Sequence, residues 1–394
     1  MEMMLAFSLM TLFLTSAIAL SATMQELRYQ AIRELKNLEL ALANTSSSTL
    51  QAKKKYGNDS EEIIVEPLTM LLSNYTTAWG RDGCSVEFSD DFDLYFPSLN
   101  ISNNPPTDIE VRNGVAYITT DSATASMPDV YIIDMGDPEL PITMSSLNTG
   151  PGLSSLEIAG HYIYAANSGT TNHLQVIDIR NRNQPVLIST LKLPPPNASS
   201  TPTTATSIFY SKGQIYLGTE KWEGREFSVI DVSKPSAPRY VGGFEIDTLV
   251  NDIYIRGDIA YVAASNVGQM RILDVRNPSS ISEADAFSPT GWETQEGKII
   301  SYFENVLSLG RTVGGFNAVN NHEIFIFAST TLSRDVPGGV YGIVHRPPYI
   351  YLAVGSVGRE FQVWKDDLSS LILERSIGFL PKAMACDGNN LYII

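Results

Sequence analysis

Apolar and polar positions recur with two different periods along this chain, and the change of period divides it into two parts. Residues 3–22 carry no charge, no glycine and no proline, so they predict a helix of roughly 30 Å, the thickness of a bilayer core. From residue 25 the apolar residues recur at three- and four-residue spacing, which predicts a continuing helix with one apolar stripe. The stripe consists of Leu27, Ala31, Leu35, Leu38 and Leu42. Because the first glycine is Gly57, we expect one long helix over residues 1–56.

Beyond residue 105 the apolar period becomes two, and a short pattern repeats. Its first element is a strand, a Gly-containing turn and an apolar strand, at residues 109–118, 156–165, 208–217 and 253–262; this pattern favours a β-hairpin. Its second element is a strand ending in an aspartate, with a proline soon after, at residues 130–134, 174–178, 227–231 and 270–274. We expect these aspartates to cap the turn after the strand. They are Asp134, Asp178, Asp231 and Asp274.

These copies resemble the LVIVD-repeat β-propellers, whose blades carry an Ile-Val-Asp-Val strand followed by Asn-Pro. The resemblance implies a mainly β fold built of blades. Counting the hairpin tyrosine, or the leucine in its place, identifies seven starts, at Tyr117, Tyr164, Tyr216, Tyr261, Leu307, Tyr351 and Tyr392. Their spacing suits four short strands per blade. We therefore expect a seven-bladed propeller over residues 84–394, carried on a long N-terminal helix.

The seventh blade is only half present at the end of the chain, which stops at Ile394 just after a hairpin. Two strand-like segments within residues 85–97, upstream of the first blade, could pair with it and close the ring, since an unpaired edge is a liability. The only two cysteines, Cys84 and Cys386, fall on the two segments that closure would join. We predict a disulfide between them, with two buried thiols as the alternative.

Three interpretations compete for the N-terminal helix. A secretory signal peptide would be cut near residues 19–22, although this segment has no Lys or Arg at its head. A plain membrane anchor would hold the propeller outside the cell. The third is suggested by residues 2–20, which resemble the mature start of type IV pilins and pseudopilins. In that family a glutamate lies near the N-terminus, as the fifth mature residue, whereas here it is the second.

The resemblance to pilins implies an assembly role for the first residues. Apolar side chains would pack in the core of a filament, and Glu2 would neutralise the N-terminal amine of a neighbouring subunit, because a lone charge in lipid is costly. The implied assembly residues are Glu2, Met3, Leu5, Phe7, Leu12 and Phe13. Residues 57–83 are expected to form a linker, with a short helix around residues 67–72.

Charge and composition limit the partners. The formal net charge of −16 argues against nucleic-acid binding, which requires a basic face. Five Asn-x-Ser/Thr triplets are candidate glycosylation sites, at Asn44, Asn58, Asn74, Asn100 and Asn197. The four histidines are scattered over different repeats, and none has metal-ligand spacing. We find no catalytic motif, so we predict no enzymatic activity, no cofactor and no metal.

These observations lead to one expected function and one alternative. The chain is expected to be a structural subunit of an extracellular type IV pilus-like filament, membrane-inserted before assembly, that displays the propeller for adhesion. Its partners would be copies of itself, the pilus assembly machinery, and a glycan or protein on another surface. The alternative is a membrane-anchored extracellular propeller that acts as a binding module or an enzyme.

Overall fold

The computed structural model describes residues 51–53, 62–64, 84, 86, 88, 105–121, 127–137, 140–265, 268–289, 295–312 and 322–394. The chain divides into two compact units, residues 1–76 and 77–394. In the first unit the structure describes two short antiparallel strands, β1 (Gln51–Lys53) and β2 (Glu62–Ile64). Residues 51–53 are therefore extended, and the expectation of an unbroken helix to residue 56 is wrong for this stretch, because cross-strand pairing with β2 replaces helical hydrogen bonds there.

The other predictions for the N-terminal part lie outside the described residues. They include the apolar run 3–22, the amphipathic stripe and the short helix around residues 67–72. Within the described ranges, no helix has the length and apolar character needed to cross a membrane.

The described residues of the second unit form six four-stranded antiparallel sheets, each made of four consecutive strands. The first two sheets contain β3 (Pro106–Arg112), β4 (Val115–Thr120), β5 (Val130–Asp134), β6 (Ile142–Leu147), β7 (Leu153–Ala159), β8 (Tyr162–Asn167), β9 (Leu174–Asp178) and β10 (Val186–Leu191). The next two contain β11 (Ala205–Ser211), β12 (Gln214–Thr219), β13 (Phe227–Asp231), β14 (Arg239–Phe244), β15 (Val250–Arg256), β16 (Ile259–Ala264), β17 (Met270–Asp274) and β18 (Ser282–Phe287). The last two contain β19 (Gly297–Phe303), β20 (Val306–Arg311), β21 (Ile324–Phe327), β22 (Thr331–Arg334), β23 (Val340–Arg346), β24 (Tyr349–Val354), β25 (Phe361–Lys365) and β26 (Leu371–Arg375).

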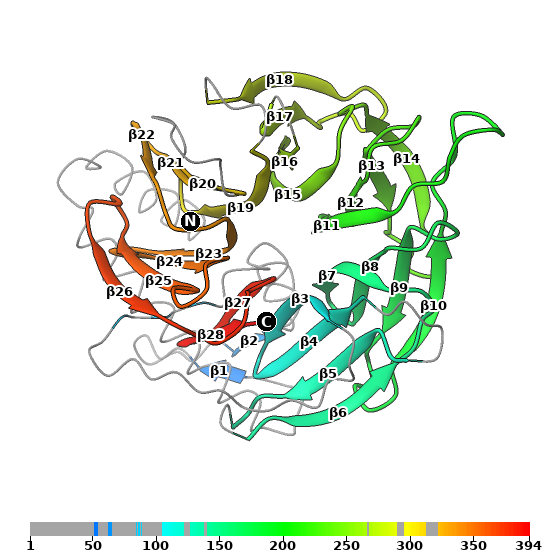
Figure 1. Cartoon of the computed structure of the whole chain (residues 1–394). Helices are drawn as coiled ribbons and strands as arrows, with labels where there is room; N and C mark the ends of the chain where they lie inside the picture. The colour runs from blue at the N-terminus through cyan, green and yellow to red at the C-terminus, as the bar shows by residue number, and fades with distance from the viewer. Residues whose placement is uncertain are drawn as a thin grey trace. The chain divides into compact units, whose positions relative to one another are not determined.

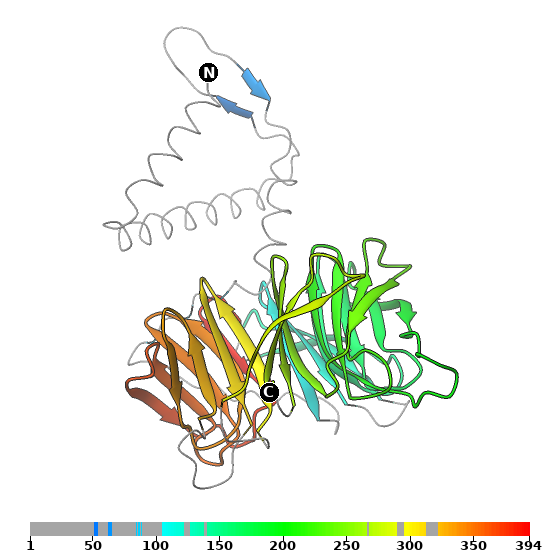
Figure 2. The same cartoon turned by 90° about the horizontal axis from the view of Figure 1, so that it is seen from above.

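The six sheets are the blades of a β-propeller (Figure 1). They follow one another around a common axis, with the first strand of each blade innermost and the fourth outermost (Figure 1). Figure 2 shows the same blades after a quarter turn. A two-stranded sheet, β27 (Met384–Asp387) and β28 (Asn390–Ile393), lies beside β3 near the C-terminus (Figure 1).

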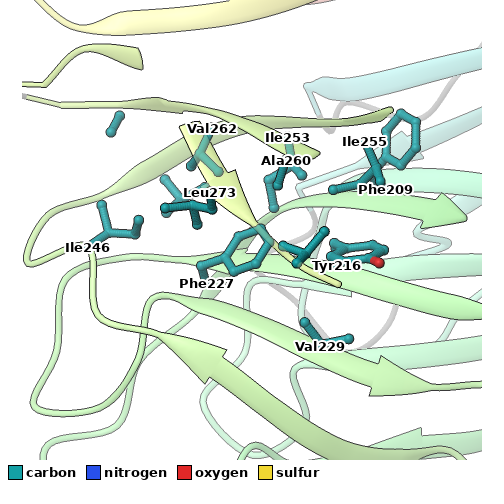
Figure 3. Close-up of a cluster of buried hydrophobic side chains, with 13 residues drawn as sticks. Phe209, Tyr216, Phe227, Val229, Ile246, Ile253, Ile255, Ala260, Val262 and Leu273 are labelled. Atoms are coloured by element: carbon teal, nitrogen blue, oxygen red, sulfur yellow. The ribbon is translucent and has the colours of Figure 1, made fainter. Parts of the chain in front are cut away.

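The hydrophobic core consists of layers between neighbouring blades. In one such layer, Phe209 and Phe227 of the third blade pack with Ile253 and Leu273 of the fourth (Figure 3). The repeated hairpin tyrosine is buried in four copies and partly buried in two. The buried copies are Tyr117, Tyr164, Tyr216 and Tyr351, and the partly buried ones are Tyr261 and Tyr392. The repeated period of two therefore marks side chains that meet the next blade rather than solvent.

The capping role predicted for the repeated aspartates is confirmed. In each of four blades the carboxylate at the end of the third strand accepts a hydrogen bond from the backbone N–H two residues later. The pairs are Asp134 with Gly136 (2.9 Å), Asp178 with Arg180 (2.9 Å), Asp231 with Ser233 (2.9 Å) and Asp274 with Arg276 (3.1 Å). These aspartates are turn residues at matching positions.

The β27–β28 hairpin occupies the seam between the first and the sixth blade. Its Ala385 and Tyr392 pack against the first blade, and its Leu391 packs against the sixth. The Asp387 carboxylate accepts a hydrogen bond from the backbone N–H of Gly114 (2.8 Å). The predicted disulfide is present: Cys84 is bonded to Cys386, 302 positions away.

The prediction of seven blades is supported only in its coarser form, as a mainly β propeller with six four-stranded blades. The sequence count treated every hairpin start as a complete blade, whereas the last start has only two strands of its own. Of residues 85–97, the structure describes Val86 and Phe88, neither of which lies in a strand. Val86 packs in the same cluster as Leu391, and Cys84 forms a single parallel bridge with Gly388.

Candidate functional site

A β-bulge recurs at the same position in all six blades. The pairing of the first strand with the second shifts by one residue after the first position, so that one residue is left without a partner. The unpaired residues are Thr107, Ser154, Thr206, Asn251, Lys298 and Tyr341. Bulges bend a strand and re-aim a side chain, and they are frequent next to functional sites.

The bulge also changes burial. The six bulged residues are all partly exposed, although the preceding residue is buried in five blades. Because they belong to the innermost strands (Figure 1), the bulged residues surround the propeller axis at one end of the blades. The bulged residue has a polar group in every blade. In a regular strand, successive side chains would alternate between the buried and the exposed face.

The hairpin at the seam adds a seventh residue of the same kind. The backbone N–H groups of Lys382 and Ala383 both donate to the carbonyl oxygen of Ile394, at 2.6 and 3.4 Å, so that two residues oppose one. Lys382 also precedes the last paired residue of β27, Asp387, by five positions, as Thr107 precedes the last paired residue of β3, Arg112. We call these seven residues the bulge ring: Thr107, Ser154, Thr206, Asn251, Lys298, Tyr341 and Lys382.

One half of the bulge ring ties neighbouring blades together. Each side chain donates to the carbonyl oxygen of the first residue in the next innermost strand. The bonds run from Thr107 to Leu153 (2.6 Å), Ser154 to Ala205 (2.7 Å), Thr206 to Val250 (2.6 Å) and Asn251 to Gly297 (2.9 Å). Each such bond contributes about 1 kcal/mol to stability.

The other half of the bulge ring carries the charge. The Lys298 ammonium donates to the side-chain oxygen of Asn251 at 3.2 Å. Burial lowers the pKa of Lys298, and the charge of Lys382 lowers it further, whereas Glu296 and Asp252 raise it. The Asp252 carboxylate also accepts backbone N–H bonds from Ile253 (2.8 Å) and Ile300 (2.7 Å). Within the described residues neither lysine forms an ion pair.

A second set of polar residues lies at the same end of the blades, immediately before the third strand. In each of the six blades this residue is buried. In five of them its side chain accepts a hydrogen bond from the backbone N–H two residues beyond the fourth strand. This bond gives a partner to a backbone donor in the turn that leads to the next blade. We call this set the latch residues: Asp129, His173, Glu226, Gln269, Glu323 and Glu360.

The latch residues explain the titration behaviour of this end of the propeller. Glu226 accepts backbone bonds from Ile246 (2.9 Å) and Asp247 (3.0 Å). Burial and the neighbouring Glu226 raise the pKa of Glu245 to about 7. Burial also raises the pKa of Asp129 and lowers that of His173. Their main role is structural, because a buried carboxylate with several N–H partners closes a turn.

Few of the site residues expected from the sequence lie in the described part of the chain. Cys84 and Cys386 form the disulfide. Asn197 is exposed in the loop between β10 and β11, and its side-chain oxygen accepts a bond from the Ser199 N–H at 2.9 Å. Outside the described residues lie Glu2, Met3, Leu5, Phe7, Leu12, Phe13, Asn44, Asn58, Asn74 and Asn100. Among the residues that the structure describes, no group of three or more His, Cys, Asp or Glu could hold a metal ion.

Reasoning from the sequence missed both the bulge ring and the latch residues. The ring contains five different residue types, so it forms no motif that a repeat search would find. The signal that could have identified it is positional: each member precedes the last paired residue of its hairpin strand by five positions. The latch residues likewise precede the apolar third strand of each blade.

Comparisons with known proteins agree with this architecture. The LVIVD repeat family model matches residues 153–192, 222–245 and 249–288, so the chain contains LVIVD repeats. No curated protein matches the chain in sequence. These repeats fall on the second, third and fourth blades.

Solved structures with a similar fold include proteins of different kinds. A periplasmic gluconolactonase of Pseudomonas aeruginosa, PpgL, is 12% identical, with a TM-score of 0.55, over 89% of this chain and 96% of that one. A protein from Lactobacillus plantarum is 12% identical, with a TM-score of 0.54, over 73% of this chain and 88% of that one. The computationally designed Ika8 protein is 10% identical, with a TM-score of 0.50, over 76% of this chain and 96% of that one. At such identities the similarity concerns the fold alone.

Proposed function

We propose that this chain is a structural subunit of an extracellular, type IV pilus-like filament that displays the propeller on its surface. The observation that carries the proposal is the Cys84–Cys386 disulfide, which closes the seam of the propeller. Structural disulfides persist in oxidising surroundings and are rare where thiols are kept reduced. A displayed domain benefits from such closure, because an open sheet edge invites pairing with neighbours.

The N-terminal sequence supports the assembly part of the proposal. Residues 3–22 are apolar and uncharged, and the stripe that follows them suits packing against other helices. In a filament these segments would repeat one head-to-tail contact that does not close, which generates a helix of subunits. Glu2 would neutralise the N-terminal amine of a neighbouring subunit, with Met3, Leu5, Phe7, Leu12 and Phe13 packed in the filament core.

Electron microscopy of native material tests this proposal. The intact chain should form filaments, and the Glu2→Ala variant should form few or none because an uncompensated amine would be buried. Glu26→Ala is the matched control, since Glu26 lies in the polar part of the same predicted helix; its filament yield should stay normal. Isolated, detergent-dependent monomers of the intact chain would refute the filament function.

We also propose that the β27–β28 hairpin is the inner half of a seventh blade, completed by residues 85–97. The support is that Lys382 repeats the bulge of the six blades and that Val86 packs with the hairpin. Hydrogen exchange tests this: backbone amides of residues 85–97 should be protected to the same degree as those of β27. Exchange of the whole segment at the rate of an unstructured chain would contradict a complete seventh blade.

The alternative function is a membrane-anchored propeller that acts as a binding module or an enzyme. The observation that favours it is the charged half of the bulge ring, where Lys298 and Lys382 lie without ion pairs in the described structure. A similar fold occurs in a gluconolactonase, but a propeller fold by itself specifies no activity. Turnover of a substrate that is abolished by Lys298→Met, with filaments absent, would favour this alternative.

A further inference from the structure

The bulge ring divides into two halves with opposite hydrogen-bonding capacity. In Thr107, Ser154 and Thr206 the single hydroxyl proton is donated to a backbone carbonyl of the next blade. A hydroxyl has one proton and two lone pairs, so these oxygens can only accept further hydrogen bonds. A ligand that contacts this half must therefore supply donors, as the hydroxyl groups of a polyol do.

The opposite half presents positive charge. Lys298 and Lys382 lie on either side of Tyr341 in the order of the blades, at the same register position. Asn251 holds the Lys298 ammonium through one hydrogen bond of 3.2 Å, and an ammonium has three protons to donate. In the described part of the chain neither lysine forms an ion pair. Burial lowers the pKa of Lys298 although the carboxylates of Glu296 and Asp252 act in the opposite direction, so a further anion would stabilise its charged form.

We propose that the bulge ring binds a small polyhydroxy carboxylate, a sugar acid, with its carboxylate on Lys298 and Lys382 and its hydroxyl groups toward Thr107, Ser154 and Thr206. The carboxylate supplies an anion with which the two lysines can form ion pairs, through charge-assisted hydrogen bonds. Hydroxyl donors on the ligand match the acceptor-only oxygens of the other half. The site belongs to a single subunit and does not depend on filament assembly.

Calorimetric titration of the full chain tests the proposal with three probes at constant ionic strength. D-Glucuronate should bind, with a dissociation constant in the millimolar range or below. D-Glucose, which has the hydroxyl groups without the carboxylate, should show no binding, and inorganic phosphate should bind at least about tenfold more weakly. Absence of binding by glucuronate, or equal binding by glucose, would overturn the proposal. Equal binding by phosphate would also overturn it, since the site would then recognise charge alone.

Substitutions locate the site. Lys298→Met and Lys382→Met should each weaken glucuronate binding by about tenfold or more, the effect of losing one charge-assisted bond. Lys234→Met is the matched control, because Lys234 is an exposed lysine in the turn after β13, at the opposite end of the blades, and it should bind glucuronate normally. Because Lys382 is exposed, we expect Lys382→Met to fold. Its affinity for glucuronate therefore tests the site even if Lys298→Met fails to fold. Unchanged affinity in Lys382→Met would refute the assignment.

Discussion

Removing the disulfide is the most informative perturbation of this propeller. The double variant Cys84→Ser with Cys386→Ser deletes the covalent link between the segment before the first blade and the final hairpin. The two cysteines are 302 positions apart, so the bond closes a loop that contains nearly the whole propeller. We expect the variant to fold but to unfold at a lower denaturant concentration.

The expected magnitude follows from the entropy of the unfolded chain. In the chain-entropy model a loop of about 100 residues contributes about 4.7 kcal/mol, and a threefold longer loop adds about 1 kcal/mol. The upper figure is therefore about 5–6 kcal/mol, comparable with the whole stability of many domains. The variant keeps the packing of Ala385, Leu391 and Tyr392 on the two flanking blades, which is why we expect it still to fold.

Guanidinium unfolding followed by tryptophan fluorescence measures this loss. Asp387→Asn is the control at the same seam, because it weakens only the bond to the Gly114 N–H and should cost about 1–2 kcal/mol. If the free energy of unfolding of the double variant lies within about 1 kcal/mol of that of the native protein, the hairpin is held by packing alone. The reasoning that the disulfide closes the ring would then be refuted.

Three further predictions concern polar groups of the blades. Burial lowers the pKa of His345 from 6.5 to about 4. Because the folded pKa lies below the unfolded one, the stability present above about pH 6.5 is lost as the pH falls toward 4, by up to about 3 kcal/mol. His345→Leu should remove this pH dependence in thermal melts. Burial and Glu226 raise the pKa of Glu245 from 4.5 to about 7, so stability falls as the pH rises from 4.5 to 7. Glu245→Gln should raise the melting temperature at pH 8 and leave it unchanged at pH 4. An equal effect at the two pH values would show that the ionisation of Glu245 is not the cause. Glu226→Ala should cost about 2–4 kcal/mol in chemical unfolding because the N–H groups of Ile246 and Asp247 lose their acceptor. Glu226→Gln should cost less, because its amide oxygen can still accept these bonds, and equal losses in the two variants would contradict this reasoning.

The accuracy of the predictions from the sequence differs between kinds of feature. The hairpins and the aspartate caps were predicted correctly, because period-two apolar patterns and Asx turns depend on residues a few positions apart. The blade count was less accurate, since it identified seven hairpin starts where the described structure has six four-stranded sheets and one two-stranded sheet. The sequence places the four histidines in different repeats. The burial of His173 and His345 could not be predicted from their spacing.

The sequence alone determined the local repeat and the turn chemistry, because each depends on residue type at short spacing. It also predicted the pairing of the only two cysteines, which the structure confirms. Only the tertiary structure decided which residues form the bulge ring. Thr206, Asn251 and Lys298 differ in their side-chain chemistry, and they become equivalent only when the strands pair out of register by one residue. That register is set by cooperative pairing within each blade and by contact with the next one. Their proximity around the axis therefore depends on the assembly of all the blades, which no local segment encodes.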